Sequence, residues 1–365
     1  MNGDAGLTGQ TAYGAAAWRY RALIFVLAAA LLLTIVVSAG LGYVKIGVLD
    51  MVKIIAARLT GDAGLLPGIG ETVPYVLMDV RLPRILTAAL VGAGLALSGV
   101  VYQGILLNPL ADPYTLGISN GAAFGASLAI VINISALGVP LGIPLGQVST
   151  PLFAFIGAIA TLFIVMRLSS FDGQISAQTL ILSGVIIGAI LSAGISLLNY
   201  LADQQVALIV FWLMGSFASS SWSGVPLLAG GLAVGLAIAF FYGRDLNIMS
   251  LGRRSSDTLG VDTTRARKIL LLTASLVTAL CVAVSGVIGF IGLIVPHLLR
   301  FLIGPDNRKL IFASALAGAL LLLAADTVTR AVLPVEVPIG VLTALIGGPF
   351  FGLIFRRKQK AGRYE

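Results

Sequence analysis

Long uncharged stretches constrain the folding of this chain more than any other feature. No Lys, Arg, Asp or Glu occurs between Ala22 and Leu41, or between Pro113 and Met166. Only 10% of the 365 residues are charged, against about 25% in a typical soluble domain, and the mean hydropathy is +1.03. A water-soluble fold could not cover its surface with so few charges. Lipid must therefore surround most of the chain, and the apolar runs indicate an all-α, polytopic transmembrane bundle.

Ten segments approach the length that a membrane-spanning helix requires, which is about 20 apolar residues for a hydrocarbon core of about 30 Å. They are Ala22–Leu41, Ile85–Leu107, Leu116–Ile134, Pro151–Met166, Leu180–Leu201, Val225–Phe241, Ile269–Val287, Phe290–Ile303, Leu310–Ala325 and Val337–Ile354. The transmembrane domain thus covers residues 22–355. A cytoplasmic N-terminal tail (1–21) and a cytoplasmic C-terminal tail (356–365) flank it.

Two further apolar pieces do not fit a complete span. Gly47–Leu59 carries charges among its apolar residues, so we expect an amphipathic helix on the membrane surface. Val206–Ser219 is short and follows Asp203, which predicts a half-helix packed on protein.

The positive charges orient the chain. With the N-terminus inside, 17 of the 23 Lys and Arg residues lie on the inner side and six on the outer side. This bias fits ten spans with both ends in the cytoplasm. The excess of Lys and Arg over Asp and Glu is thus explained by the orientation of the chain in the membrane, and no nucleic-acid partner is expected.

Groups that carry chemistry are scarce. The chain has no G-x-x-x-x-G-K-[ST] loop and no H-E-x-x-H motif, and the single His297 and single Cys281 exclude a multi-histidine metal site and an intrachain disulfide. Asp326 ends one span and Asp203 follows another. A secondary carrier driven by protons or sodium would place carboxylates at mid-membrane, so this alternative is disfavoured, as is a membrane-embedded enzyme. We expect no cofactor or metal in this chain.

The longest cytoplasmic loop, within residues 243–268, mixes charged and apolar residues. Ser255 and Ser256 could cap a short helix, and the Leu-Gly pairs at 251–252 and 259–260 could end helices. Two short amphipathic helices would offer an apolar ridge to a soluble partner. An ordinary solvated loop is the alternative.

One internal similarity suggests an inverted repeat. Leu86–Val91 resembles Leu272–Val277, and Ser98-Gly99 with Pro109 recurs as Ser285-Gly286 with Pro296. Inverted-topology repeats are common in transporters, but two Ala/Leu-rich helices can also coincide by chance.

A series of motifs in chain order resembles a known family. They are Arg81-Leu-Pro-Arg84, Ser98-Gly99, Gln103, Asn108-Pro-Leu-Ala-Asp-Pro113, Leu116-Gly-Ile-Ser-Asn-Gly121, Trp212-Leu-Met-Gly-Ser-Phe217, Gly289-Phe-Ile-Gly-Leu-Ile-Val-Pro-His297 and Pro338-Ile-Gly-Val-Leu-Thr343. Together with the Leu251-Gly and Leu259-Gly-Val loop, they are similar to the FecCD-type permeases of bacterial iron-siderophore, haem and cobalamin importers. Arg253-Arg254 departs from the family, which usually has an acidic residue there.

The resemblance implies an assembly in the bacterial inner membrane. Two ten-helix subunits would form a homodimer with the translocation path along its axis. Two copies of a cytoplasmic ATP-binding-cassette (ABC) ATPase would hold ATP and Mg²⁺, and a periplasmic substrate-binding protein would deliver a bulky metal chelate. No residue distinguishes a ferric siderophore, haem or cobalamin.

The resemblance also implies roles for three groups of residues. Coupling to the ATPase falls on Leu246, Met249, Leu251, Gly252, Leu259 and Gly260, and the cytoplasmic gate on Asn108, Leu110, Ser176 and Gln178. Docking of the binding protein falls on Arg81, Arg84 and Arg330. From the residues alone, Arg81 and Arg84 could instead anchor a helix end at the interface, Arg330 could pair with Asp326, and Asn108 could be the polar stop of a Pro-terminated helix.

Overall fold

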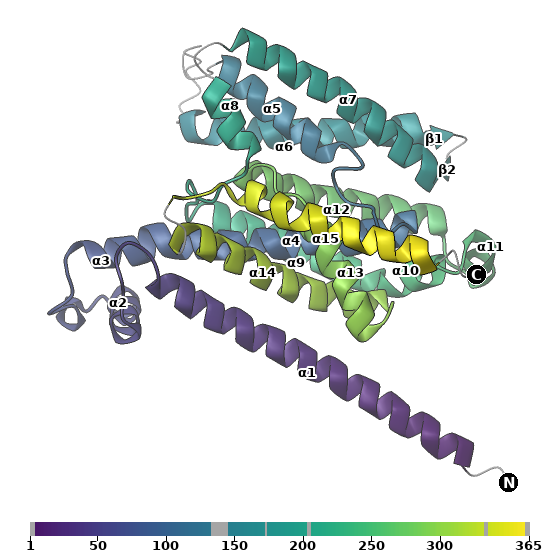
Figure 1. Cartoon of the computed structure of the whole chain (residues 1–365), viewed down its shortest axis with the longest axis horizontal. Helices are drawn as coiled ribbons and strands as arrows, with labels where there is room; N and C mark the ends of the chain where they lie inside the picture. The colour runs from purple at the N-terminus through teal and green to yellow at the C-terminus, as the bar shows by residue number, and fades with distance from the viewer. Residues whose placement is uncertain (1–3, 133–144, 172–173, 203–205, 332–334, 362–365) are drawn as a thin grey trace.

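The computed structural model describes residues 4–132, 145–171, 174–202, 206–331 and 335–361, and most of these residues are helical (Figure 1). Asp203, which precedes the predicted half-helix, lies outside the described residues. The helices in chain order are α1 Asp4–Gly40, α2 Val48–Thr60, η1 Ala63–Leu65, α3 Thr72–Tyr75, η2 Val76–Arg81, α4 Leu82–Leu106, α5 Ile118–Ile132, α6 Leu145–Ser169, α7 Ala177–Leu201, α8 Val206–Leu213, α9 Gly224–Phe241, α10 Gly243–Met249, α11 Arg253–Thr258, α12 Thr263–Ser285, α13 Ile291–Ile303, α14 Asn307–Ala331 and α15 Ile339–Ala361.

Each of the ten predicted spans corresponds to a helix. Within the described ranges, seven helices are long and apolar enough to cross a membrane. Three shorter apolar helices, at Ile118–Ile132, Ile291–Ile303 and Ile339–Leu353, account for the remaining predicted spans. The all-α fold class is confirmed, while the count of ten spans stays a prediction. The short segments α2 and α8 form helices where the sequence predicts them.

Three local features differ from expectation. Helix α1 begins at Asp4 and α15 ends at Ala361, so both helices continue through the segments expected to be tails. Between α6 and α7, the two-residue strands β1 (Ser170–Phe171) and β2 (Gln174–Ile175) pair in an antiparallel ladder.

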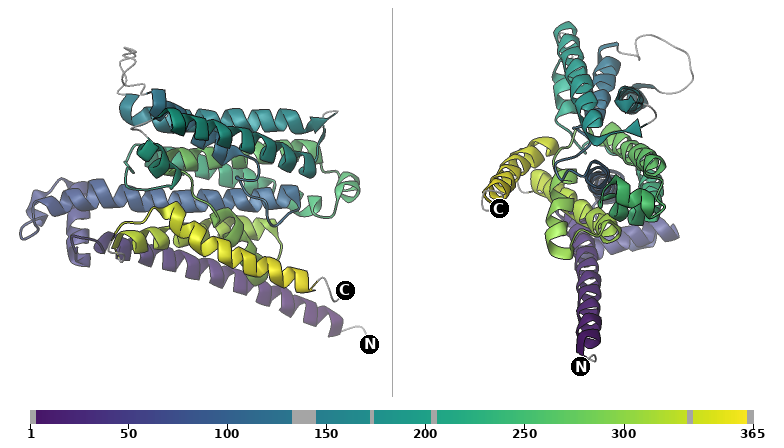
Figure 2. Two further views of the ribbon diagram at one scale, coloured as in Figure 1. Left: turned by 45° about the horizontal axis from the view of Figure 1, so that its top comes forward. Right: turned by 90° about the vertical axis from the view of Figure 1, so that its right-hand side faces the viewer.

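The helices form two groups. Figure 1 shows α5, α6, α7 and α8 stacked on a second group that contains α4, α9 and α12 to α15. Helix α4 lies at the centre: 83% of its most apolar stretch is buried inside the chain, against 11% for α1. Figure 2 shows that α1 runs along the side opposite α5–α8 and that its N-terminal end projects away from the bundle.

Backbone contacts at glycines hold α4 against its neighbours. A Cβ atom on Gly92 of α4 would lie 2.3 Å from the carbonyl oxygen of Gly318 in α14, and one on Gly99 would lie 2.0 Å from that of Gly292 in α13. Helices in lipid associate through such close approaches of small residues. Helices α5 and α6 of the α5–α8 group approach each other in the same way: a Cβ atom on Gly121 would lie 2.5 Å from the carbonyl oxygen of Gly157.

The motifs of the suspected repeat occupy different structural positions. Ser98 and Gly99 lie inside α4, whereas Ser285 ends α12 and Gly286 follows it with φ +69°. The motifs therefore do not mark equivalent points of two repeats. The helices that carry them do touch, because the Ser98 hydroxyl donates to the Ala274 carbonyl oxygen at 3.0 Å.

Candidate functional site

The predicted docking arginines gather at the outer end of the bundle, where α4 and α14 meet. Arg84 lies in the first turn of α4 and forms a buried ion pair with Asp326 of α14: its Nε is 3.1 Å from both carboxylate oxygens, and its Nη2 is 2.7 Å from Oδ1. The same Nη2 donates to Glu336 Oε1 at 2.6 Å. Asp326 is fully buried, while the Glu336 side chain is 47% exposed.

The other two arginines bind the C-terminal end of α1. Arg81 Nη1 donates to the Ala39 carbonyl oxygen at 2.7 Å and its Nη2 to that of Val44. Arg330 Nη2 donates to the Ser38 carbonyl oxygen at 2.8 Å, and its Nη1 to that of Leu41 at 3.0 Å. The last carbonyl groups of a helix have no intrahelical donor, so both cations stabilise this helix end. Arg81 and Arg84 are buried and Arg330 is half-buried, and their role in docking stays a prediction.

The predicted gate residues lie on two segments: Asn108 and Leu110 follow α4, and Ser176 and Gln178 stand at the start of α7. After α4, the Asn108 side chain accepts a hydrogen bond from the Leu110 backbone N–H at 3.0 Å, within the loop that follows the helix. Ser176 caps α7 by accepting from the Thr179 N–H at 3.1 Å, and Gln178 is exposed. Further along α7, a Cβ atom on Gly184 would lie 2.3 Å from the Thr115 carbonyl oxygen, so α7 packs on the α4–α5 connection.

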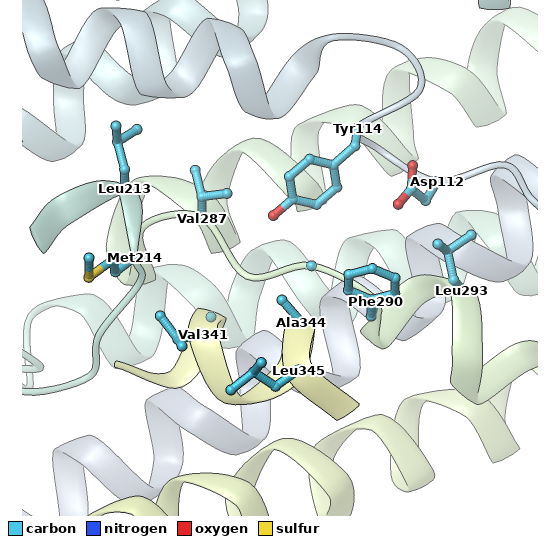
Figure 3. A pocket seen from close by; sticks show the side chains of 12 residues that line it. Asp112, Tyr114, Leu213, Met214, Val287, Phe290, Leu293, Val341, Ala344 and Leu345 are labelled. Carbon is cyan, nitrogen blue, oxygen red and sulfur yellow. The ribbon is translucent and has the colours of Figure 1, made fainter. Parts of the chain in front are cut away.

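An open cavity of about 670 Å³ begins beside this connection. Figure 3 shows Asp112 and Tyr114 at one side of it and apolar side chains of α15 at the other. Its lining residues are Asp112, Tyr114, Leu213, Met214, Val287, Gly289, Phe290, Leu293, Gly340, Val341, Ala344 and Leu345. The cavity thus lies between α8, the α12–α13 loop and α15.

Backbone contacts fix the walls of this cavity. The Gly340 N–H donates to the Met214 carbonyl oxygen at 3.0 Å, which joins α15 to the end of α8. Phe290 adopts φ +68°, a left-handed conformation that is uncommon for a bulky residue, and a Cβ atom on Gly347 would lie 2.4 Å from its ring. Strained backbone of this kind is characteristic of functional sites.

Asp112 and Tyr114 are not among the predicted site residues, although Asp112 belongs to the Asn108–Pro113 motif. Asp112 lies in the loop between α4 and α5, outside the spans, and its Oδ1 accepts from the Thr115 N–H at 3.0 Å. Burial raises the pKa of Asp112 to about 6, while backbone hydrogen bonds from Thr115 and Tyr114 act in the opposite direction. The sequence signal for Asp112 was a single carboxylate between Pro109 and Pro113, next to a long uncharged stretch.

The loop predicted to meet a soluble partner contains two short helices, α10 and α11. Leu251 and Leu259 are 63% and 60% exposed and follow the two helices. Gly252 and Gly260 adopt φ +92° and +78°, a region that favours glycine and breaks the helices there.

Part of the predicted apolar ridge is wrong. Leu246 and Met249 are 0% and 4% exposed, so they face the chain's own core and not a partner. The reason is that α10 packs on the C-terminal end of α4, where a Cβ atom on Gly104 would lie 3.0 Å from the Leu246 side chain. The neighbouring Asn247 accepts from the Asn307 backbone N–H at 2.8 Å and so ties α10 to α14.

The predicted capping by Ser255 and Ser256 is also wrong. Helix α11 begins at Arg253 with Gly252 as its N-cap, so both serines lie inside the helix. The buried Ser256 hydroxyl instead donates to the Ile248 carbonyl oxygen at 3.0 Å, which packs α11 against α10.

Within the described part of the chain, no group of three or more His, Cys, Asp or Glu could hold a metal ion.

The sequence was compared with known proteins. The sequence model of the FecCD transport family matches residues 30–357. The molybdate import system permease protein MolB of Haemophilus influenzae is 39% identical, covering 95% of this chain and 98% of that protein. The hemin transport system permease protein HmuU of Yersinia pestis is 42% identical over 79% of this chain and 86% of its own length.

A solved structure is also similar. It is described as an inward-facing conformation of a metal-chelate type ABC transporter, and it matches with a TM-score of 0.78 and 35% sequence identity. The match covers 92% of this chain and 99% of that one.

The buried ion pair at the outer end predicts a specific stability defect. Arg84→Gln leaves Asp326 buried without its cation, and losing one partner of a buried pair typically costs about 3–5 kcal/mol. We therefore expect a clear drop in the unfolding temperature of the purified protein in detergent. Lys309→Gln is the matched control, because Lys309 and Asp306 form a half-exposed pair at 3.9 Å that is worth about 1 kcal/mol or less. Equal unfolding temperatures for both variants would contradict the assignment.

Asp112 predicts a pH dependence. Its folded-state pKa of about 6 lies above the ordinary value of 3.8, so the folded state binds the proton more tightly than the unfolded state. The stability from this group is present at low pH and is lost as pH rises toward and through about 6. We expect the unfolding temperature of the wild type, relative to Asp112→Asn, to be higher at pH 4.5 than at pH 7.5. A difference that does not change with pH would exclude this titration.

Proposed function

Because this chain belongs to the FecCD transport family, we propose that it is the permease of an ABC importer that carries a ferric siderophore or haem into the cytoplasm. The observation that carries the proposal is the family match, which runs through nearly all spans, from residue 30 to residue 357. At the coarser level, the chain is the permease subunit of an ABC importer for metal chelates, and cobalamin stays an alternative cargo. The curated relatives include permeases named for hemin, cobalamin, Fe(3+)-citrate and molybdate import.

The distribution of carboxylates supports an external energy source. Asp112 and Asp326 are the buried carboxylates in the described part of the chain. Asp326 is held by Arg84, and Asp112 lies in a loop. Neither is placed as the mid-membrane ion site that a secondary carrier would require.

The proposed mechanism couples ATP hydrolysis in a partner to motion of this chain. The exposed Leu251 and Leu259 form the apolar surface for the ATPase, with Gly252 and Gly260 setting the bends beside them. The buried Leu246 and Met249 anchor α10 on α4. Movement of α10 and α11 therefore reaches the ends of α4 and α14 directly, since Leu246 packs beside Gly104 and Asn247 binds Asn307.

The proposed path uses the cavity beside the α4–α5 connection. A homodimer would place this cavity near the axis, with Asn108, Leu110, Ser176 and Gln178 as the cytoplasmic gate. Its mostly apolar lining suits a bulky chelate whose specificity rests with the binding protein.

Docking of a substrate-binding protein at the outer arginines completes the proposal. Since Arg81 and Arg84 are buried, a partner would meet the half-buried Arg330 and the exposed Glu336 first. Carboxylates of the partner would bind Arg330. A partner that displaces Glu336 would also disturb the hydrogen bond between Arg84 and Glu336.

Reconstitution tests the proposed function. The purified chain alone in liposomes should show no ATPase activity. Uptake of a ferric siderophore or haem should require the ATPase, ATP and the substrate-binding protein together. Accumulation driven by a pH or sodium gradient without ATP would instead identify a secondary transporter.

The ATPase surface predicts a second outcome. Leu251→Asp places a charge in an apolar contact, which is costly unless the charge is paired, so the ATPase should no longer co-purify while the permease still inserts. Leu59→Asp is the control, because Leu59 is 82% exposed and lies in α2, at the end of the molecule opposite α11 (Figure 1). Full co-purification and transport by the Leu251→Asp variant would show that the loop is merely solvated.

A further inference from the structure

A second large cavity opens on the side of the bundle away from α5–α8. Its volume is about 900 Å³, and its lining residues are Tyr20, Arg21, Ile24, Phe25, Ala28, Leu31, Leu86, Ala89, Leu90, Ala93, Val225, Ala229, Leu232, Leu236, Phe312, Ala315, Leu316 and Ala319. They come from α1, α4, α9 and α14, and nearly all are apolar. The cavity lies where α1 diverges from the bundle (Figure 2), and we call it the α1 groove.

Positive charge is concentrated at the cytoplasmic end of the α1 groove. Arg21 lines the groove near the inner end of α1. Arg308, in the first turn of α14, lies one turn before the groove residue Phe312 and on the same helix face. Its guanidinium carbon is 4.5 Å from the centre of the Phe240 ring, which in turn is 5.1 Å from that of Phe312.

Arg308 has unused hydrogen-bonding capacity. Its side chain is half-buried, and its Nε has no hydrogen-bond partner among the described residues. A guanidinium that rests on an aromatic ring and has no carboxylate partner keeps donors for an anion. The long apolar wall and the two cations therefore call for a molecule with an apolar chain and an anionic end.

The length of the groove matches one membrane leaflet. Along α1 it extends from Tyr20 to Leu31, a distance of about 16 Å at the rise of an α-helix. This is close to half of a hydrocarbon core of about 30 Å. Arg21 and Arg308 lie on the cytoplasmic side, where anionic phospholipid headgroups attract basic residues.

We propose that the α1 groove binds an anionic phospholipid of the cytoplasmic leaflet. The phosphate lies between Arg21 and Arg308, and an acyl chain packs along Ala28, Ala229 and Ala315, whose small side chains leave the space. The outer end of α1 is tied to the bundle by Arg81 and Arg330. The lipid fills the gap beside the other half of this helix.

Native mass spectrometry can test the site after reconstitution of the full chain in vesicles of phosphatidylglycerol and phosphatidylethanolamine. We expect the wild type to retain phosphatidylglycerol through detergent washing. The double variant Arg21→Gln/Arg308→Gln should lower the retained ratio of phosphatidylglycerol to phosphatidylethanolamine by roughly tenfold or more. Arg167→Gln/Arg356→Gln removes the same charge from exposed positions on α6 and α15 and should leave the ratio unchanged.

A second pair of variants tests the acyl-chain part. Ala229→Phe fills the groove from an exposed position on α9 and should reduce retention of the lipid, whereas Leu227→Phe, on another face of the same helix, should not. Equal retention in the wild type and in both groove variants would overturn the proposal. So would photo-crosslinking from position 25 that captures a polypeptide in place of lipid.

Discussion

The contact between α4 and α14 holds the rest of the structure in place. At mid-membrane, Gly92 and Gly318 bring the two backbones together, and at the outer end Arg84 pairs with Asp326. At the cytoplasmic end, α10 touches both helices through Leu246 and Asn247. Because lipid provides no hydrophobic drive between helices, this unit depends on close packing along its length and on one buried ion pair.

The α4–α14 unit suggests how a signal crosses the membrane. A displacement of α10 acts on the inner ends of both helices, and a tightly packed pair moves as one body because a glycine contact leaves no room to slide. Helices α5–α8 form the neighbouring group, whose α7 meets the α4–α5 connection at Gly184 and Thr115. The cavity beside Asp112 and Tyr114 lies next to this connection, so relative motion of the two groups would change its shape.

Much of the fold could be predicted from the sequence because lipid leaves few options. Apolar runs indicate helices, and the charge bias indicates orientation, so each predicted span corresponds to a helix. The partners of the arginines could not be predicted. Asp326 and Glu336 lie 242 and 252 positions from Arg84, and no local pattern relates them. The burial of Leu246 likewise depends on the missing side chain of Gly104, a tertiary effect that periodicity does not contain.

This chain has few charged side chains, and the arginines within the bundle differ in the partners that they bind. Arg81 and Arg330 donate to carbonyl groups at the end of α1, and Arg84 binds two carboxylates. Each of these cations therefore has oxygen partners within the chain, although the Nε of Arg330 has none. Arg308 rests on an aromatic ring with its Nε unpaired in the described structure. A half-buried cation without an anionic partner in its own chain can bind an external anion. At the cytoplasmic edge of a bilayer, the phospholipid phosphate is the anion at hand.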